Sequence, residues 1–204
     1  RLYEDNYRHP TETEISAALK RMVIKSPVVA FLTGHGERSI DGIGERDYYA
    51  FSQYKDFRSS LVNQGFESIS LSLDSVNKVP ENIDILVISD VRTALSPKEQ
   101  EIIENYIAEG RNLLIAGEPR RQEQMNPLLA PLGLSFMPGI LVQESKDFSA
   151  DLILANPTMV SLDVINRFDK LLAFGNQITM PSAVGIKQTE EKKMFLKELF
   201  GFEL

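Results

Sequence analysis

Apolar residues along this chain alternate between short continuous runs and stretches with helical spacing. The run Val28–Leu32 is uniformly apolar and leads into a glycine-rich loop, which is typical of a strand buried on both faces of a sheet. Comparable runs occupy residues 83–88 and 112–116. Between residues 66 and 73, apolar and polar residues alternate with period two, which predicts a strand nearer the edge of the sheet.

Stretches with helical spacing lie before and after the first of these predicted strands. Residues 11–25 begin with a capping box and continue with apolar residues at helical spacing, so they predict an amphipathic helix that Pro27 ends. A second helix is expected over residues 47–63, with Gly65 as its stop. The residues expected on its buried face are Phe51, Tyr54, Phe57 and Leu61.

The clearest helix follows the third predicted strand. Ser96 is suited to the N-cap, Pro97 to the first helical position and Glu99 to the third, while Gly110 is a natural end. The remaining pattern is weaker. It predicts a helix over residues 121–132, strands over residues 134–142 and 177–180, a turn at residues 156–157 and a final helix over residues 190–199.

Strands that alternate with helices predict an α/β fold with an open, mostly parallel sheet. Right-handed crossovers between parallel strands place helices on both faces of such a sheet. We expect residues 1–142 to form this α/β core domain, and residues 143–204 to form a C-terminal extension that packs on the core or completes it.

Composition excludes several classes of function. The chain has 204 residues, 22 of them Lys or Arg against 29 Asp or Glu, and the net charge of −7 argues against a nucleic-acid partner. The absence of cysteine excludes disulfides, thiolate metal sites and a cysteine nucleophile. No apolar run is long enough to span a membrane, but a chain that begins at Arg1 and ends at Leu204 is expected to be cut from a longer protein.

The candidate site lies where the strands end, because ligands of open parallel sheets bind beyond the carboxyl ends of the strands. The first strand is followed by the loop of residues 33–37, the third by Asp90 and the fourth by Glu118. Tyr48 and Tyr49 are the expected aromatic lining. The loop itself consists of Thr33, Gly34, His35, Gly36 and Glu37.

This loop matches known chemical motifs only in part. Gly34-His35-Gly36 resembles the start of a dinucleotide fingerprint, but another polar loop intervenes before the next helix, so no cofactor is predicted. His35 with Glu37 and Glu118 could hold a metal weakly, although no established metal-ligand spacing supports it. No serine elbow is present. The remaining interpretation is structural, in which the glycines form a tight turn and His35 and Glu37 order the loop.

Several segments resemble a known family in the same order along the chain. Phe31-Leu32-Thr33-Gly34-His35-Gly36-Glu37 is similar to a segment of the auxiliary extracytoplasmic subunits of ABC-type export systems, the group that includes the gliding-motility GldG-like proteins. The helix before this segment also resembles the family. The further matching segments are residues 84–88, 95–99, 106–115 and 131–134.

The resemblance implies a flavodoxin-like, glutamine-amidotransferase-like fold on the extracytoplasmic (periplasmic) side of the cell membrane. It also implies ABC permease and ATPase subunits as partners, and membrane anchoring by segments outside this sequence. Enzymes of that fold use a cysteine at an elbow, and this chain has none. The leading hypothesis is therefore a non-catalytic binding or scaffolding domain. The alternatives are a domain that binds or hydrolyses a small sugar or peptide at the His35 and Glu37 loop, and a structural module whose glycine loop is only a turn.

Overall fold

The computed structural model describes residues 12–156 and 177–189. The chain divides into two compact units, and each is described by itself. The first unit comprises residues 1–117 and 123–132, and the second comprises residues 118–122 and 133–204. The division into a core of residues 1–142 and an extension of residues 143–204 remains a prediction.

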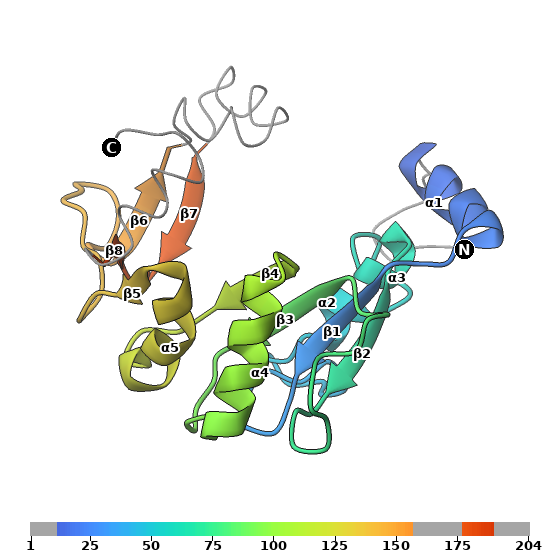
Figure 1. Cartoon of the computed structure of the whole chain (residues 1–204). Helices are drawn as coiled ribbons and strands as arrows, with labels where there is room; N and C mark the ends of the chain where they lie inside the picture. Colours follow the sequence, from blue (N-terminus) through green and yellow to red (C-terminus); the bar gives the residue numbers. More distant parts are fainter. Residues whose placement is uncertain (1–11, 157–176, 190–204) are drawn as a thin grey trace, which may run out of the picture. The chain divides into compact units, whose positions relative to one another are not determined.

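The first unit contains four strands and the helices between them (Figure 1). The expected strands Val28–Leu32 and Asn112–Ala116 are confirmed as β1 and β4. The elements of this part of the chain are α1 Glu12–Val23, β1 Val28–Leu32, α2 Tyr49–Ser52, α3 Leu61–Gln64, β2 Glu67–Leu71, β3 Ile85–Ser89, α4 Pro97–Ala108, β4 Asn112–Ala116, α5 Gln122–Leu129 and the 3₁₀ turn η1 Ala130–Leu132.

The four strands form a parallel sheet with the order β2-β1-β3-β4, which confirms the predicted fold class. From β1 the chain crosses to β2 on one side, and from β3 it crosses to β4 on the other. Right-handed crossovers in opposite directions put α4 and the α2–α3 segment on opposite faces, and Figure 1 shows α4 in front of the sheet and α2 behind it. The order of the strands therefore reverses between β1 and β3.

Helix α4 forms because its first turn carries the capping box read from the sequence. The Ser96 hydroxyl accepts a hydrogen bond from the Glu99 N–H, and the Glu99 carboxylate accepts one from the Ser96 N–H at 2.7 Å. Pro97 occupies the first helical turn, and Gly110, with a φ of 70°, follows the end. Ile102, Ile103 and Tyr106 are buried. The prediction for this helix is confirmed.

The prediction of one continuous helix over residues 47–63 is wrong. Two short helices, α2 and α3, occupy this stretch. The buried amide of Asn63 donates hydrogen bonds to the carbonyls of Lys55 and Phe57, both at 2.8 Å. A side chain that satisfies these carbonyls replaces the bonds that a continuous helix would make. Gly65 does end α3, in a left-handed conformation with a φ of 92°.

Side chains connect the strands at their amino-terminal ends. The Val28 N–H donates to the Asp84 carboxylate at 2.8 Å, and the Asn112 amide donates to the Asp84 carbonyl at 3.0 Å. The Arg111 guanidinium donates to the carbonyls of Val79, Pro80 and Ile83 at 3.1, 2.9 and 2.7 Å. These bonds anchor the segment that leads into β3.

Within residues 133–156 and 177–189, the second unit contains two antiparallel strand pairs. They are β5 Leu134–Phe136 with β8 Ile186–Gln188, and β6 Leu152–Ala155 with β7 Ile178–Pro181. The strand expected over residues 177–180 is confirmed as β7. The strand predicted over residues 134–142 is shorter in the structure and ends at Phe136. Pro138 has no backbone N–H to donate to a neighbouring strand, and Gly139 has a φ of 81°. The helix expected over 190–199 lies outside the described residues.

Candidate functional site

The glycine loop of residues 33–37 leaves β1 at the point where the strand order reverses, which is where ligands of open α/β sheets bind. Both glycines have backbone conformations that favour glycine, with a φ of 125° at Gly34 and 79° at Gly36. A Cβ added at Gly36 would lie 3.1 Å from the Cβ of Arg92, so the loop also packs closely on the segment after β3. The glycines are therefore explained by the shape of the loop.

Gly36→Ala is expected to lower the free energy of unfolding by about 2 kcal/mol, because it adds crowding against Arg92 to an unfavourable φ. Gly110→Ala is the matched control. It has a similar φ of 70° but nothing within 4 Å of the added Cβ, and should cost about 1 kcal/mol. Chemical denaturation measures both, and equal losses would contradict the crowding argument.

His35 lies between two carboxylates. Its Nδ1 is 3.5 Å from Glu37 Oε1, and its Nε2 is 3.3 Å from Glu99 Oε2. The side chains of His35, Glu37 and Glu99 are 12%, 1% and 3% exposed, so the group is almost closed to solvent. The backbone N–H of His35 also donates to Glu37 Oε2 at 2.6 Å. The imidazole thus links the loop after β1 to the first turn of α4.

The backbone of His35 is fixed as firmly as its ring. Its carbonyl accepts hydrogen bonds from the N–H groups of Arg92 and Thr93 at 2.9 and 3.1 Å. These donors belong to the segment after β3. The loop is consequently attached to both of the elements that flank it, the segment after β3 and the start of α4.

Glu99 joins this cluster although the sequence indicated only its capping role. Burial acts most strongly on its pKa and raises it, but hydrogen bonds from the Ser96 hydroxyl and N–H, together with His35, outweigh burial and leave the pKa below the ordinary value. The usable sequence feature was the position of Glu99 in the first turn of the helix after β3, because that turn must lie at the carboxyl edge of the sheet.

Because the pKa of Glu99 is lowered, the free energy of unfolding is expected to fall as the pH becomes acidic. The stabilisation from the ionised carboxylate is complete above the unfolded-state pKa of 4.5 and is lost as the pH falls through the lower pKa of the folded state. Glu99→Gln should therefore lose less stability than the wild type on acidification below about pH 5. Urea denaturation across this range measures the difference, and parallel pH profiles would argue against the ionised state.

Asp90 follows β3 on the other side of the reversal point. It has a φ of 52°, its side chain is 2% exposed, and its N–H donates to the Ala116 carbonyl at 2.8 Å. Its Oδ2 lies 3.6 Å from the Arg46 guanidinium and 3.4 Å from that of Arg92. Both arginine side chains are about half exposed, at 58% and 45%, so positive charge faces solvent beside the loop.

The other expected site residues have different surroundings. The Tyr48 ring packs edge-on against Phe31 and Phe51 with centroid distances of 6.1 Å for each pair, so it is part of the packing over β1. Thr33 is exposed and its N–H donates to the Leu71 carbonyl at 3.0 Å. Glu118 belongs to the second unit, not to the unit that carries the glycine loop.

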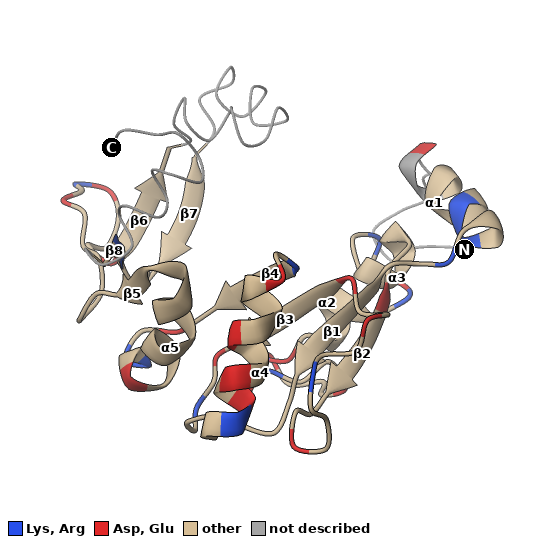
Figure 2. Ribbon diagram, viewed as in Figure 1, with Lys and Arg blue, Asp and Glu red and all other residues tan. Residues whose placement is uncertain are grey.

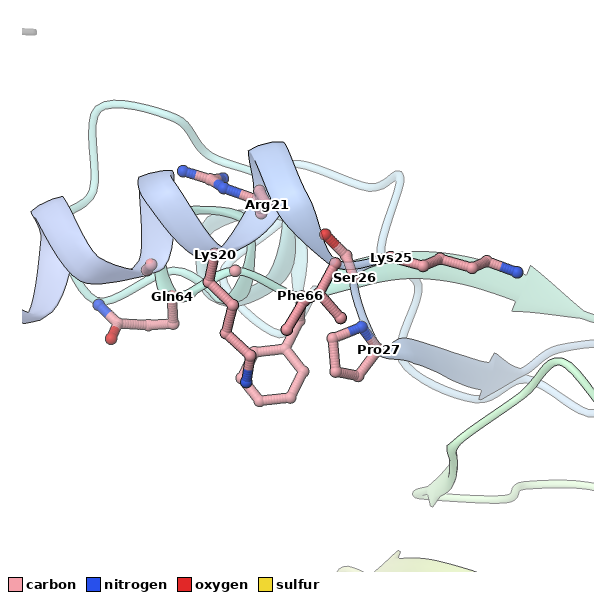
Figure 3. A pocket seen from close by; sticks show the side chains of 10 residues that line it. Lys20, Arg21, Lys25, Ser26, Pro27, Gln64 and Phe66 are labelled. Atoms are coloured by element: carbon pink, nitrogen blue, oxygen red, sulfur yellow. The ribbon is translucent and has the colours of Figure 1, made fainter.

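Hollows in the first unit lie away from the glycine loop itself. One is lined by Ile43, Tyr49 and Tyr54 among others, so the expected lining residue Tyr49 does border a hollow. The second lies between the end of α1 and the turn before β2, where Figure 3 shows the side chains that surround it. Lys20 and Arg21 line this second hollow, at a helix end where basic residues favourably oppose the helix dipole.

The cluster offers little for catalysis. The imidazole faces two buried carboxylates, and among the residues that the structure describes no serine or threonine hydroxyl binds either of its nitrogens. Within residues 12–156 and 177–189, no group of three or more His, Asp or Glu side chains is arranged to hold a metal ion. Figure 2 shows acidic residues gathered on α4, and Glu101 and Glu104 there are exposed to solvent. The arrangement is suited to holding the loop in one conformation.

Comparisons with known proteins agree with this fold. The sequence model of a family described as "ABC-type uncharacterized transport system", an auxiliary component, matches residues 26–166. A solved structure titled "mmIFT52 N-terminal domain" is similar with a TM-score of 0.54 and 14% identity over 80% of this chain and 69% of that one, which shows a shared fold alone. No curated protein matches. In the described part of the chain, no helix is long and apolar enough to cross a membrane.

Proposed function

Because this chain belongs to the auxiliary components of ABC-type transport systems, we propose that it is a non-catalytic binding or scaffolding domain of an ABC export system. We place it on the extracytoplasmic side of the membrane, with permease and ATPase subunits as its partners. Anchoring would come from segments outside the printed sequence. The gliding-motility GldG-like systems are the proposed subgroup, because the ordered motifs between residues 31 and 134 resemble theirs.

The observation that carries the non-catalytic role is the enclosure of His35. A general base must reach the proton that it removes, and its site must admit a substrate. The His35 ring is 12% exposed and both nitrogens face carboxylates, at 3.5 and 3.3 Å. The backbone bonds from Arg92 and Thr93 leave the loop little freedom to open. These contacts favour a rigid surface that a partner protein recognises.

Co-purification from native membranes tests the proposal. The full-length protein carries a tag, the membranes are solubilised gently, and the bound proteins are identified. We expect a permease and an ATPase in the eluate, since the family belongs to an ABC-type system. Recovery of the protein alone from the soluble fraction would contradict the proposed role.

A second function, binding of a small anionic sugar or peptide at the same loop, is favoured by one observation. The half-exposed side chains of Arg46 and Arg92 lie at the reversal point of the sheet, where such ligands bind in other open α/β sheets. Under this hypothesis, Arg46→Ala and Arg92→Ala would each weaken ligand binding. Lys78→Ala is the control, because the exposed Lys78 lies beside Glu109 and Arg111, which precede β4, and should leave binding unchanged.

His35→Ala separates the two functions. Under the scaffolding proposal it lowers the free energy of unfolding by about 1–2 kcal/mol, because two buried carboxylates lose their contact with the imidazole. Co-purification of the partner proteins below the melting temperature is unchanged. Thermal-shift screening of the wild type and His35→Ala against sugars and peptides checks the alternative. A ligand that stabilises only the wild type would favour a binding site at the loop.

A further inference from the structure

Helix α1 carries an apolar stripe that the first unit leaves uncovered. Ile15, Leu19 and Met22 are 49%, 59% and 83% exposed, and Ala18 is also exposed. Among the residues of this helix whose burial is described, Ala17 alone is buried. Helical spacing of 3.6 residues puts Ile15, Ala18, Leu19 and Met22 on one face and Ala17 on the opposite face. The helix therefore contacts its own unit through the face that carries the small side chain of Ala17. It presents Ile15, Leu19 and Met22 to solvent.

Charge is distributed unevenly along the same helix. The exposed Glu12 is its first residue, and the exposed Lys25 follows its last turn. Lys25 extends away from the hollow in Figure 3, while Arg21 donates to the Val62 carbonyl and is directed toward the unit. One end of the exposed face is thus acidic and the other basic.

We propose that this face binds the same face of a second copy of the chain, with the two α1 helices antiparallel. A two-fold axis midway between residues 18 and 19 pairs Ala18 with Leu19, Ile15 with Met22 and Glu12 with Lys25. Each of the four residues of the stripe then opposes another apolar residue of the stripe, and each acidic end opposes a basic end. Antiparallel helices also oppose their dipoles favourably. A two-fold pair of this kind is closed, so it forms a dimer and not a filament.

The proposed contact is small, so the dimer should be weak and concentration-dependent. Four short apolar side chains per copy bury less than the roughly 800 Å² per partner of a standard stable interface. Sedimentation velocity of the 204-residue chain should show a monomer at low micromolar concentration and a dimer at high micromolar concentration. A chain that stays monomeric throughout would overturn the proposal and leave the stripe to another part of the chain or another protein.

A pair of substitutions tests the apolar contact. Leu19→Lys should weaken dimerisation by at least about tenfold, because each copy loses a buried leucine and gains a charge. The matched control is Ile43→Lys, which places the same change at a residue that is 89% exposed elsewhere in the unit. Both replaced side chains are exposed in the monomer, so neither change should unfold the chain. An equal effect of the two variants would refute the assigned surface.

Charge reversal tests the pairing of the ends. Glu12→Lys and Lys25→Glu each oppose like charges in their own dimers and should weaken them. The double variant restores the pairing, and an equal mixture of the two single variants should form a heterodimer more readily than either forms its own dimer. Additive weakening in the double variant would argue against the proposed register.

Introduced cysteines test the direction of the helices, and the chain has no other cysteine to interfere. Residue 18 lies next to the proposed axis, so Ala18→Cys should form a disulfide-linked dimer under mild oxidation. The two copies of residue 12 would lie about 20 Å apart along the helix axis, so Glu12→Cys should not. Cross-linking at both positions would indicate parallel helices and overturn the antiparallel pairing.

Discussion

Replacing Glu99 with alanine is expected to lower the free energy of unfolding by about 3 kcal/mol. The change removes the acceptor of the Ser96 N–H and hydroxyl hydrogen bonds, both 2.7 Å long, and with it half of the capping box of α4. It also removes the carboxylate that lies 3.3 Å from His35 Nε2. A single substitution therefore weakens both the start of a helix and the attachment of the glycine loop.

Glu101→Ala is the matched control for this prediction. It removes a carboxylate from the same helix, but from an exposed position, and should change stability by less than about 0.5 kcal/mol. Urea denaturation followed by circular dichroism measures both variants. If Glu99→Ala were no more harmful than Glu101→Ala, the contacts among Ser96, Glu99 and His35 would not contribute to stability.

Arg111→Met should cost a similar amount, about 2–3 kcal/mol. The guanidinium donates to three carbonyls of residues 79–83, and its carbon Cζ lies 4.5 Å from the centroid of the buried Tyr106 ring. Methionine keeps much of the apolar stem but leaves the carbonyls without these donors. We expect the segment before β3 to loosen, with faster amide hydrogen exchange at residues 79–84 than in the wild type.

The control for Arg111 lies in the same segment. Lys78→Met removes the exposed pair that Lys78 forms with Glu81, and exposed pairs contribute little to stability. Its stability and hydrogen exchange should match those of the wild type. A similar loosening in both variants would show that any lost positive charge near this segment is sufficient, and would contradict the role of the Arg111 hydrogen bonds.

The parts of the fold that the sequence predicted well are those with local causes. Helix α4 has its cap, its proline and its closing glycine within 15 consecutive positions of the printed sequence, from Ser96 to Gly110, so each end is marked by residues that act on their immediate neighbours. The same holds for β1, whose five residues are all buried and all apolar. The order of such elements was enough to predict the parallel sheet.

The error over residues 47–63 comes from a side-chain contact that apolar spacing does not encode. The apolar spacing between Phe51 and Leu61 is compatible with one helix, but the buried Asn63 amide binds carbonyls within this stretch and two short helices result. A propensity argument does not include such a bond.

The sequence indicated which strand ends carry the candidate residues but not the contacts among those residues. It placed His35 after the first strand and Asp90 after the third, and β1 and β3 pair side by side in the sheet. The contact between His35 and Glu99 joins residues that are 64 positions apart in the printed numbering, and no local pattern encodes it. Tyr48, expected to face a ligand, packs on Phe31 because the chain turns back over β1 there.

The strand order β2-β1-β3-β4 has a consequence for how the sheet assembles as the chain is made. A chain that emerges from the ribosome or from a translocation channel with its N-terminus first delivers a central strand, β1, before any other. β2 then adds to one free edge of β1, β3 to the other, and β4 to the outside of β3. Every new strand finds its partner already present, and none has to be inserted between two strands that have paired. The sheet can therefore grow outward from its middle while the rest of the chain is still arriving.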